Sequence, residues 1–194
     1  MKYQDITIRA KDSYRLSARL FDVSEPKAVV QVLHGMEEHK GRYDDFAAFL
    51  QENGFAVLTC DMRGHGSDAP LLSHIADKGG DRLLVSDVRR YQESALCGKE
   101  FTLGSYDALF RLVSAIAEPK LYRNVLSIIP ILLISGEDDP CTGGEAGRKV
   151  SADVLRQAGF ECITVETIPH MRHEILNETG HEAVYKKILE FLEG

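Results

Sequence analysis

The segment AVVQVLHG, residues 28–35, joins an almost continuous apolar run to a His-Gly pair. Side chains alternate between the two faces of a strand, so apolar residues at consecutive positions are typical of a parallel strand covered on both faces. Gly35 allows the backbone to turn sharply after such a strand. The segment therefore predicts a buried parallel strand that ends in a polar loop.

Strands and helices alternate on either side of this segment. Apolar residues at helical spacing predict a helix over 43–53, which Gly54 ends, and residues 55–60 form another apolar run. A second set of elements lies near the carboxyl terminus, with strands over 130–135 and 162–168 and helices over about 145–158 and 182–192. This alternation predicts a doubly wound α/β fold with a mostly parallel sheet.

Two regions depart from the alternation. Residues 5–10 and 14–21 alternate in period two around a short polar turn, which predicts an amino-terminal antiparallel hairpin. Residues 91–127 show helical periodicity and no convincing strand, with one helix beginning near Tyr106. The apolar stripe of this helix comprises Leu109, Phe110, Val113 and Ile116. We expect the stripe to pack against the body, and the alternative is a lid that touches lipid.

Composition limits the classes of function. The 194 residues, 44% of them hydrophobic, suffice for one globular domain over 1–194. A net charge of -7 offers no basic field for nucleic acid or an anionic membrane surface, so we expect no nucleic-acid partner. No apolar run approaches the ~20 residues that span a bilayer, and the amino terminus shows no signal core. We therefore expect a cytoplasmic protein without integral membrane association, and its four cysteines, which form no CxxC pair, should be reduced thiols.

Polar loops follow the predicted strands at four places, namely residues 34–43, 61–67, 136–140 and 169–174. A backbone N–H exposed by the turn at Gly35 would suit an oxyanion, although a merely structural turn is the simpler interpretation of a lone His-Gly pair. An acid in the third loop and a histidine in the fourth follow neighbouring strands. A carboxylate there can hold a histidine in one tautomer and stabilise its imidazolium.

The four loops together resemble the motifs of the monoacylglycerol lipases and lysophospholipases, serine hydrolases of the α/β-hydrolase superfamily with a serine aminopeptidase S33 type domain. The run HGMEEHKGRY, residues 34–43, resembles their HGxxEHxxRY signature, and DMRGHGS, residues 61–67, is similar to their D-x-R-G-H-G-x-S loop. Their G-x-x-D pattern selects Asp139 over Asp138, and their G-x-x-H pattern selects His173 over His170.

The resemblance implies an α/β-hydrolase fold and a triad that contains Asp139 and His173. It implies that the backbone N–H of Met36 binds the oxyanion. Supporting roles in the pocket and its loops fall to His34, Gly35, His39 and His65. It also implies a small-molecule acyl ester or lipid substrate, no cofactor and no metal.

The sequence contains no Gly-x-Ser-x-Gly motif, which a nucleophile elbow requires on a strand-to-helix turn. The family would place this unit, roughly 30 residues or more, after the helix that contains residues 84–91. The chain passes instead into residues 95–127, which resemble what remains of the family's helical cap. Ser67 and Ser105 are weak candidates for the nucleophile, because neither lies in a strand-turn-helix context.

Two explanations fit the missing elbow, and they predict different geometry. An internal deletion of two central strands should pair residues 29–33 with residues 131–135. A sequence that joins two segments around absent residues should instead show a wide spatial gap between Tyr91 and Cys97. We favour the second explanation, because excising a central strand exposes large apolar surfaces.

Three classes of function remain open. The leading hypothesis is a serine ester hydrolase, and the missing elbow favours a catalytically inactive acyl-ligand binding protein as the alternative. A metal-dependent hydrolase using His170, His173 and Glu174 fits poorly, since no HExxH or other zinc spacing occurs. Residues 143–149 do not meet the spacing of a phosphate-binding loop.

Overall fold

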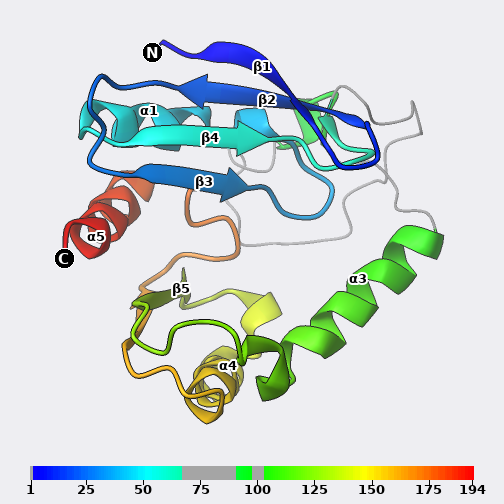
Figure 1. Cartoon of the computed structure of the whole chain (residues 1–194). Coiled ribbons are helices and arrows are strands. Elements are labelled where there is room, and N and C mark those ends of the chain that lie inside the picture. Colours follow the sequence, from blue (N-terminus) through cyan, green and yellow to red (C-terminus); the bar gives the residue numbers. More distant parts are fainter. Residues whose placement is uncertain (1, 67–90, 98–102) are drawn as a thin grey trace. The chain divides into compact units, whose positions relative to one another are not determined.

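The computed structural model of this chain describes residues 2–66, 91–97 and 103–194 (Figure 1). They fall into two compact units. The N-terminal unit comprises residues up to 100 together with Tyr185–Glu190, and the C-terminal unit comprises Phe101–Val184 and Phe191–Gly194. No helix in the described ranges is both long enough and apolar enough to cross a membrane.

The N-terminal unit begins with the predicted hairpin. Strand β1 (Gln4–Arg9) pairs antiparallel with β2 (Arg15–Phe21), with Ile6 opposite Ala18. The turn is closed by a hydrogen bond from the Ser13 N–H to the Ala10 carbonyl. The prediction of an amino-terminal antiparallel hairpin is therefore confirmed.

The first βαβ unit is also as predicted. Strand β3 (Val29–Leu33) leads through α1 (Asp44–Glu52) to β4 (Ala56–Cys60), and β3 and β4 pair in parallel. Strand β4 also pairs antiparallel with β2, which gives the sheet order β1-β2-β4-β3. Helix α1 lies on one face of this sheet (Figure 1).

The core of the N-terminal unit is fully buried on that face. Its largest buried side chains include Phe21, Leu50 and Val57, from β2, α1 and β4. The ring of Tyr185, from α5 (His181–Glu193), lies 4.9 Å from the ring of Phe46. Burial of aromatic and aliphatic side chains of this size supplies most of the stability of such a unit.

Strand β3 differs from the prediction that both of its faces are covered. Val29 and Leu33 expose 66% and 62% of their surface, and both point to the same face because they are separated by an even number of residues. In the described ranges β3 is the edge strand of its sheet. The apolar run correctly predicted the strand. It did not predict which elements pack on the two faces, because the sequence pattern shows only that each face carries apolar side chains.

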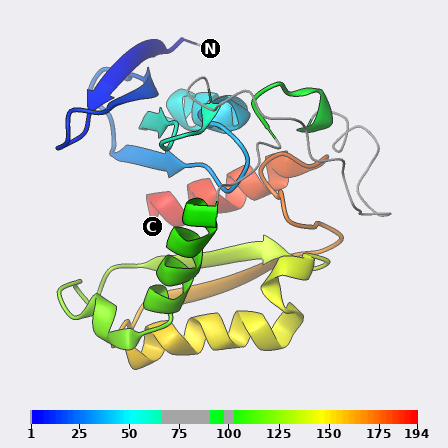
Figure 2. The ribbon, with the colours of Figure 1, turned by 90° about the vertical axis from the view of Figure 1, so that its right-hand side faces the viewer.

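The C-terminal unit contains a second βαβ unit. Strand β5 (Ile131–Gly136) leads through α4 (Gly144–Gln157) to β6 (Ile163–Ile168), and the two strands pair in parallel from Ile131 opposite Ile163 to Gly136 opposite Ile168. Figure 2 shows α4 running along one face of the pair. Because the strands are parallel and in this register, their carboxyl ends lie side by side.

Helix α3 (Leu103–Ile116) begins three residues before the predicted start and is followed by the short helix η3 (Pro119–Tyr122). The packing of its apolar stripe against the body stays a prediction, and within the C-terminal unit Leu109 is half-buried. Phe110, Val113 and Ile116 expose 64%, 50% and 44% of their surface. The sequence pattern correctly predicts an amphipathic helix, but a stripe alone does not specify a partner.

The strand pairing expected of an internal deletion is not found in the described ranges, and the explanation of absent residues stays a prediction. Strands β3 and β5 belong to separate sheets, so the pairing expected of an internal deletion does not occur. Residues 91–93 are helical, and a turn follows in which Ser94 N–H is bonded to Tyr91 O and Cys97 N–H to Ser94 O.

Candidate active site

Two loops meet at the carboxyl ends of β5 and β6 in the C-terminal unit. The N–H of Glu137 donates to the carbonyl of Ile168 at 2.8 Å, and the N–H of Asp138 donates to the carbonyl of Met171 at 2.9 Å. Gly136 makes this approach possible, since a Cβ there would lie 2.1 Å from the carbonyl oxygen of Arg172. These bonds fix the loop after β5 against the loop after β6.

The meeting of the loops brings Asp139 and His173 together. His173 Nδ1 lies 3.1 Å from Asp139 Oδ2 and 3.2 Å from Oδ1. The Asp139 side chain is 6% exposed and the His173 side chain 64% exposed, whereas Asp138 is exposed to solvent. The structure thus brings Asp139 and not Asp138 to His173, and the catalytic roles of the pair stay a prediction.

Backbone donors hold both members of the pair. Asp139 precedes the short helix η4 (Pro140–Thr142), and its Oδ1 accepts from the N–H of Cys141 at 2.8 Å. On the other loop the buried carboxylate of Glu178 accepts from the N–H groups of Arg172 and Glu174, at 2.9 and 2.8 Å. Glu178 thus holds the backbone on either side of His173 through these two hydrogen bonds.

Sequence reasoning missed two residues of this site. Glu178 lies in a polar run that reads as an exposed loop, and only its spacing of four residues from Glu174 hints at a capping role. Cys141 is exposed two residues after Asp139, and partial burial together with the Asp139 carboxylate raises the pKa of its thiol. In the described ranges Asp139, Cys141 and His173 are the one group of side chains whose atoms could hold a metal ion.

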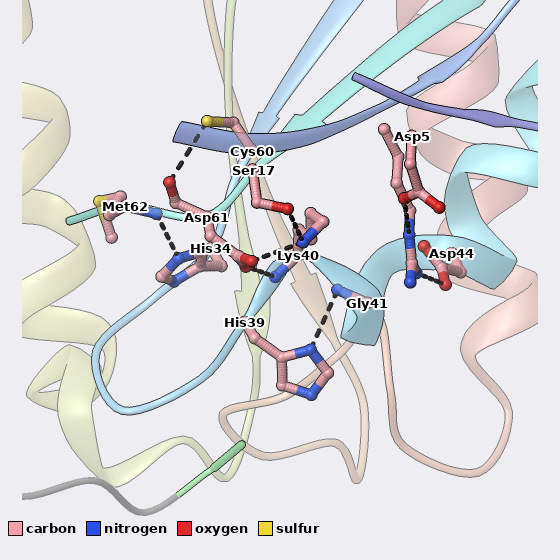
Figure 3. A network of polar contacts seen from close by, with 11 residues as sticks. Asp5, Ser17, His34, His39, Lys40, Gly41, Asp44, Cys60, Asp61 and Met62 are labelled. Carbon is pink, nitrogen blue, oxygen red and sulfur yellow. Dashed lines mark hydrogen bonds and ion pairs between the residues drawn. The ribbon is translucent and has the colours of Figure 1, made fainter. Parts of the chain in front are cut away.

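The loops after β3 and β4 in the N-terminal unit are joined through His34. Its Nε2 accepts from the N–H of Met62 at 2.9 Å (Figure 3). This leaves the proton on Nδ1, which lies 2.8 Å from the Gly35 carbonyl oxygen. The ring is buried, with 4% of the residue exposed. The ring of His65 packs against it at a tilt of 51°, with ring centroids 4.9 Å apart. His34 is therefore held as one neutral tautomer.

The turn that contains Met36 is tied down by Glu38. The N–H of Gly35 donates to Glu38 Oε1 at 2.7 Å, and the hydroxyl of Tyr43 donates to the same oxygen at 3.0 Å. Arg42 Nε lies 3.0 Å from Oε2. Met36 itself is 48% exposed, so this turn presents it at the surface of the unit.

His39 faces inward, in contrast to His173. The N–H of Gly41 donates to its Nδ1 at 3.2 Å, and Nε2 lies 3.3 Å from the hydroxyl of Ser94 (Figure 3 shows the first contact). Burial lowers the pKa of His39 from its ordinary value of 6.5. Since Nδ1 accepts from an amide, the remaining proton sits on Nε2, and this histidine cannot accept a proton from Ser94.

A buried ion pair lies between these loops and was not expected from the sequence. Lys40 Nζ is 2.5 Å from Asp61 Oδ2 and 3.0 Å from the hydroxyl of Ser17, and the Lys40 N–H donates to Asp61 Oδ1 at 2.8 Å (Figure 3). The two residues are 8% and 2% exposed. Every one of these contacts is internal, so the network holds the loops and offers no free group.

The two weak serine candidates gain no support. Ser67 lies outside the described residues. Ser105 lies inside the first turn of α3, two residues after the helix begins at Leu103. A nucleophile elbow places its serine on the turn between a strand and a helix, so the backbone position of Ser105 does not match one.

Comparison with solved structures defines the class of fold. A carboxyl esterase from Bacillus coagulans in complex with glycerol superposes over 100% of this chain and 99% of its own, with a TM-score of 0.74 and 18% identity. A monoglyceride lipase variant from Saccharomyces cerevisiae superposes over 100% and 96%, with a TM-score of 0.71 and 12% identity. The fold is that of the α/β-hydrolases.

The family model described as serine aminopeptidase, S33, matches residues 24–80 and 84–180, and the chain therefore belongs to this family. The monoglyceride lipase of Rattus norvegicus is 28% identical over 149 residues, which is 70% of this chain and 46% of the rat protein. The chain thus spans about half the length of the curated relatives it matches. The relationship to monoacylglycerol lipases that the motifs indicated is confirmed.

Proposed function

We propose that the protein is an acyl-ester hydrolase of the monoacylglycerol lipase or lysophospholipase type, in which Asp139 and His173 form the acid–base pair. The observation that carries the proposal is the contact of 3.1 Å between His173 Nδ1 and the buried Asp139 carboxylate. Its substrates would be small acyl esters, of which the names of its relatives suggest monoacylglycerols, and the sequence motifs add lysophospholipids.

The contact with Asp139 supports this chemistry because it selects one tautomer of the His173 ring. Asp139 accepts the Nδ1 proton, which leaves Nε2 unprotonated and able to remove a proton from a nucleophile. The exposed imidazole can then pass that proton to the leaving alcohol, while the carboxylate stabilises the imidazolium formed in between. Because Glu178 and Cys141 fix the two loops through the backbone, the pair is preorganised before any substrate binds.

We also propose an oxyanion role for the turn that follows β3. The turn at Gly35, held by Glu38, presents the peptide N–H of Met36, which we assign to the oxyanion. His34, His39 and His65 would support this loop. We further infer that residues 1–194 form one α/β-hydrolase domain and that residues 95–127 are the remnant of its cap.

The nucleophilic serine is not among the motifs of these 194 residues. The chain on its own should therefore hydrolyse p-nitrophenyl butyrate no faster than its His173→Ala variant, because a base without a nucleophile has nothing to activate. Intact mass before and after a fluorophosphonate probe should show no adduct. An adduct together with turnover that Ser67→Ala or Ser105→Ala abolishes would reveal a relocated nucleophile and disprove this part of the proposal.

A restoration experiment tests the acid–base pair directly. A strand, Gly-x-Ser-x-Gly turn, helix and strand from a family member that has the motif would be inserted between Glu93 and Ser94. Hydrolysis by the restored protein should fall about 100-fold or more in its His173→Ala variant and stay unchanged in His170→Asn. Equal rates in all three would mean that His173 is not the base. Binding of a monoacylglycerol without turnover in the original chain would favour the alternative, an inactive acyl-ligand binding protein.

A further inference from the structure

Three side chains that commonly bind metals converge at the carboxyl ends of β5 and β6. One carboxylate oxygen of Asp139, Sγ of Cys141 and one ring nitrogen of His173 all lie within 4.8 Å of one another. Asp139 is buried, whereas Cys141 and His173 are exposed. The cluster is therefore anchored on its inner side and open to solvent on its outer side.

The spacing of these atoms suits a tetrahedral ion. Zinc binds nitrogen and oxygen at about 2.0–2.1 Å and sulfur at about 2.3 Å, which places two ligands of one ion about 3.3–3.6 Å apart. The observed 3.1 and 3.2 Å between His173 Nδ1 and the Asp139 oxygens already lie close to that range. Binding of an ion would draw the exposed Cys141 Sγ from within 4.8 Å to about 3.6 Å of the other two ligand atoms.

The backbone around Asp139 prepares this arrangement. Oδ1 accepts from the N–H of Cys141 at 2.8 Å, which orients the carboxylate and leaves Oδ2 available to an ion. Pro140 restricts the chain between the two ligands, and the Thr142 hydroxyl donates to the Asp139 carbonyl at 2.9 Å. Such outer contacts fix the direction of a ligand and strengthen metal binding.

We propose that Asp139, Cys141 and His173 form a binding site for Zn²⁺, with water as the fourth ligand. A thiolate, an imidazole and a carboxylate form the mixed set of donors that zinc prefers and that Mg²⁺ and Ca²⁺ do not. The carboxylate and the thiolate together carry two negative charges, which balance the divalent ion. The thiol proton passes to solvent when the ion binds.

Zinc and the acid–base role would exclude each other. A metal on Nδ1 uses the lone pair of that nitrogen and moves the imidazole proton to Nε2, so the ring can no longer act as a base toward a nucleophile. This consequence rests on the proposed function, whereas the binding site itself does not. The two claims can therefore fail independently.

The test is zinc binding by the whole chain, measured by competition with a chromogenic chelator after removal of bound metal. We expect one Zn²⁺ per chain and a loss of affinity of about tenfold or more in Cys141→Ser and in His173→Ala. The control variants are Cys162→Ser, which removes another exposed thiol, and His170→Asn, which removes the neighbouring exposed histidine. Asn suits the positive φ of 60° at residue 170. Both controls should bind zinc like the unmodified chain.

Co²⁺ provides a second readout that a general loss of folding cannot imitate. Its complex with the unmodified chain should show a thiolate-to-metal absorption band, which Cys141→Ser should lose and Cys162→Ser should keep while both retain the same circular dichroism. Unchanged zinc affinity in Cys141→Ser, or equal loss in the two controls, would overturn the site. Absence of stoichiometric zinc binding by the unmodified chain would overturn it as well.

Discussion

The loops that follow the strands of the two units carry similar residues in opposite states. In the N-terminal unit His34, Lys40 and Asp61 are buried, and their polar atoms bond to one another or to the backbone. In the C-terminal unit Asp139 is equally buried, but its partner His173 exposes 64% of its side chain. One set of loops is satisfied internally, and the other leaves a ring nitrogen for an external molecule.

This difference in burial and hydrogen bonding distinguishes a structural histidine from a reactive one better than residue type does. Histidine occurs in both places, and only its surroundings decide whether it can take up a proton. A buried polar group whose bonds are all made costs free energy to disturb and offers nothing to a substrate. The three variants below test the contrast, from the largest expected effect to the smallest.

Lys40→Met should have the largest effect. It leaves the Asp61 carboxylate buried without its counter-ion, which costs about 3–5 kcal/mol in the free energy of unfolding. Urea unfolding measured by circular dichroism would report the change. Arg63→Met is the matched control, because its ion pair with Asp12 lies at the surface, with side chains 50% and 58% exposed, and should contribute little. Equal losses in the two variants would contradict an internally satisfied network.

Gly136→Ala should destabilise the C-terminal unit by about 1–3 kcal/mol, because the added Cβ meets backbone and not a flexible side chain. Urea unfolding followed by hydrogen exchange of the β5 and β6 amides would locate the loss in this unit. Gly104→Ala, on the exposed surface of α3, is the control and should not destabilise the chain. If Gly136→Ala matched that control, the close approach of the two loops would not be a constraint.

His39→Gln should have the smallest effect, and it should depend on pH. Burial lowers the pKa of His39 in the folded chain below 6.5, so the unfolded chain binds more protons as the pH falls through that value. This residue's stabilising contribution is complete above the unfolded pKa and is lost below it. The unfolding free energy of His39→Gln should therefore fall less between about pH 8 and pH 5 than that of the unmodified chain. Parallel curves for the two proteins would show that His39 protonates equally in both states.

Sequence patterns were sufficient where one local rule determines the structure. Continuous apolar runs and the helices between them identified both βαβ units, and parallel pairing then placed Asp139 and His173 at one edge. The spacing from Gly136 distinguished Asp139 from Asp138, because the first residues after β5 still bond to the neighbouring loop.

Contacts between distant residues could not be predicted in this way. Lys40 and Asp61 are 21 positions apart, and a lysine after a loop histidine reads as solvated until its burial is known. Cys141 and His173 meet only because two loops cross, so no metal spacing appears in the sequence. The stripe of α3 is a similar case, because amphipathicity shows that a helix has an apolar side without specifying what covers it.

The hydrogen bonds from the backbone to Glu178 have an evolutionary consequence. It holds residues 172 and 174 through their amide groups, so the shape of the loop does not depend on which side chain occupies position 173. Selection for stability alone would then preserve this loop, and the carboxylate opposite it, in a lineage that had lost its reaction. A descendant protein could keep the backbone geometry of an active site without its reaction, and a different ligand could then bind there.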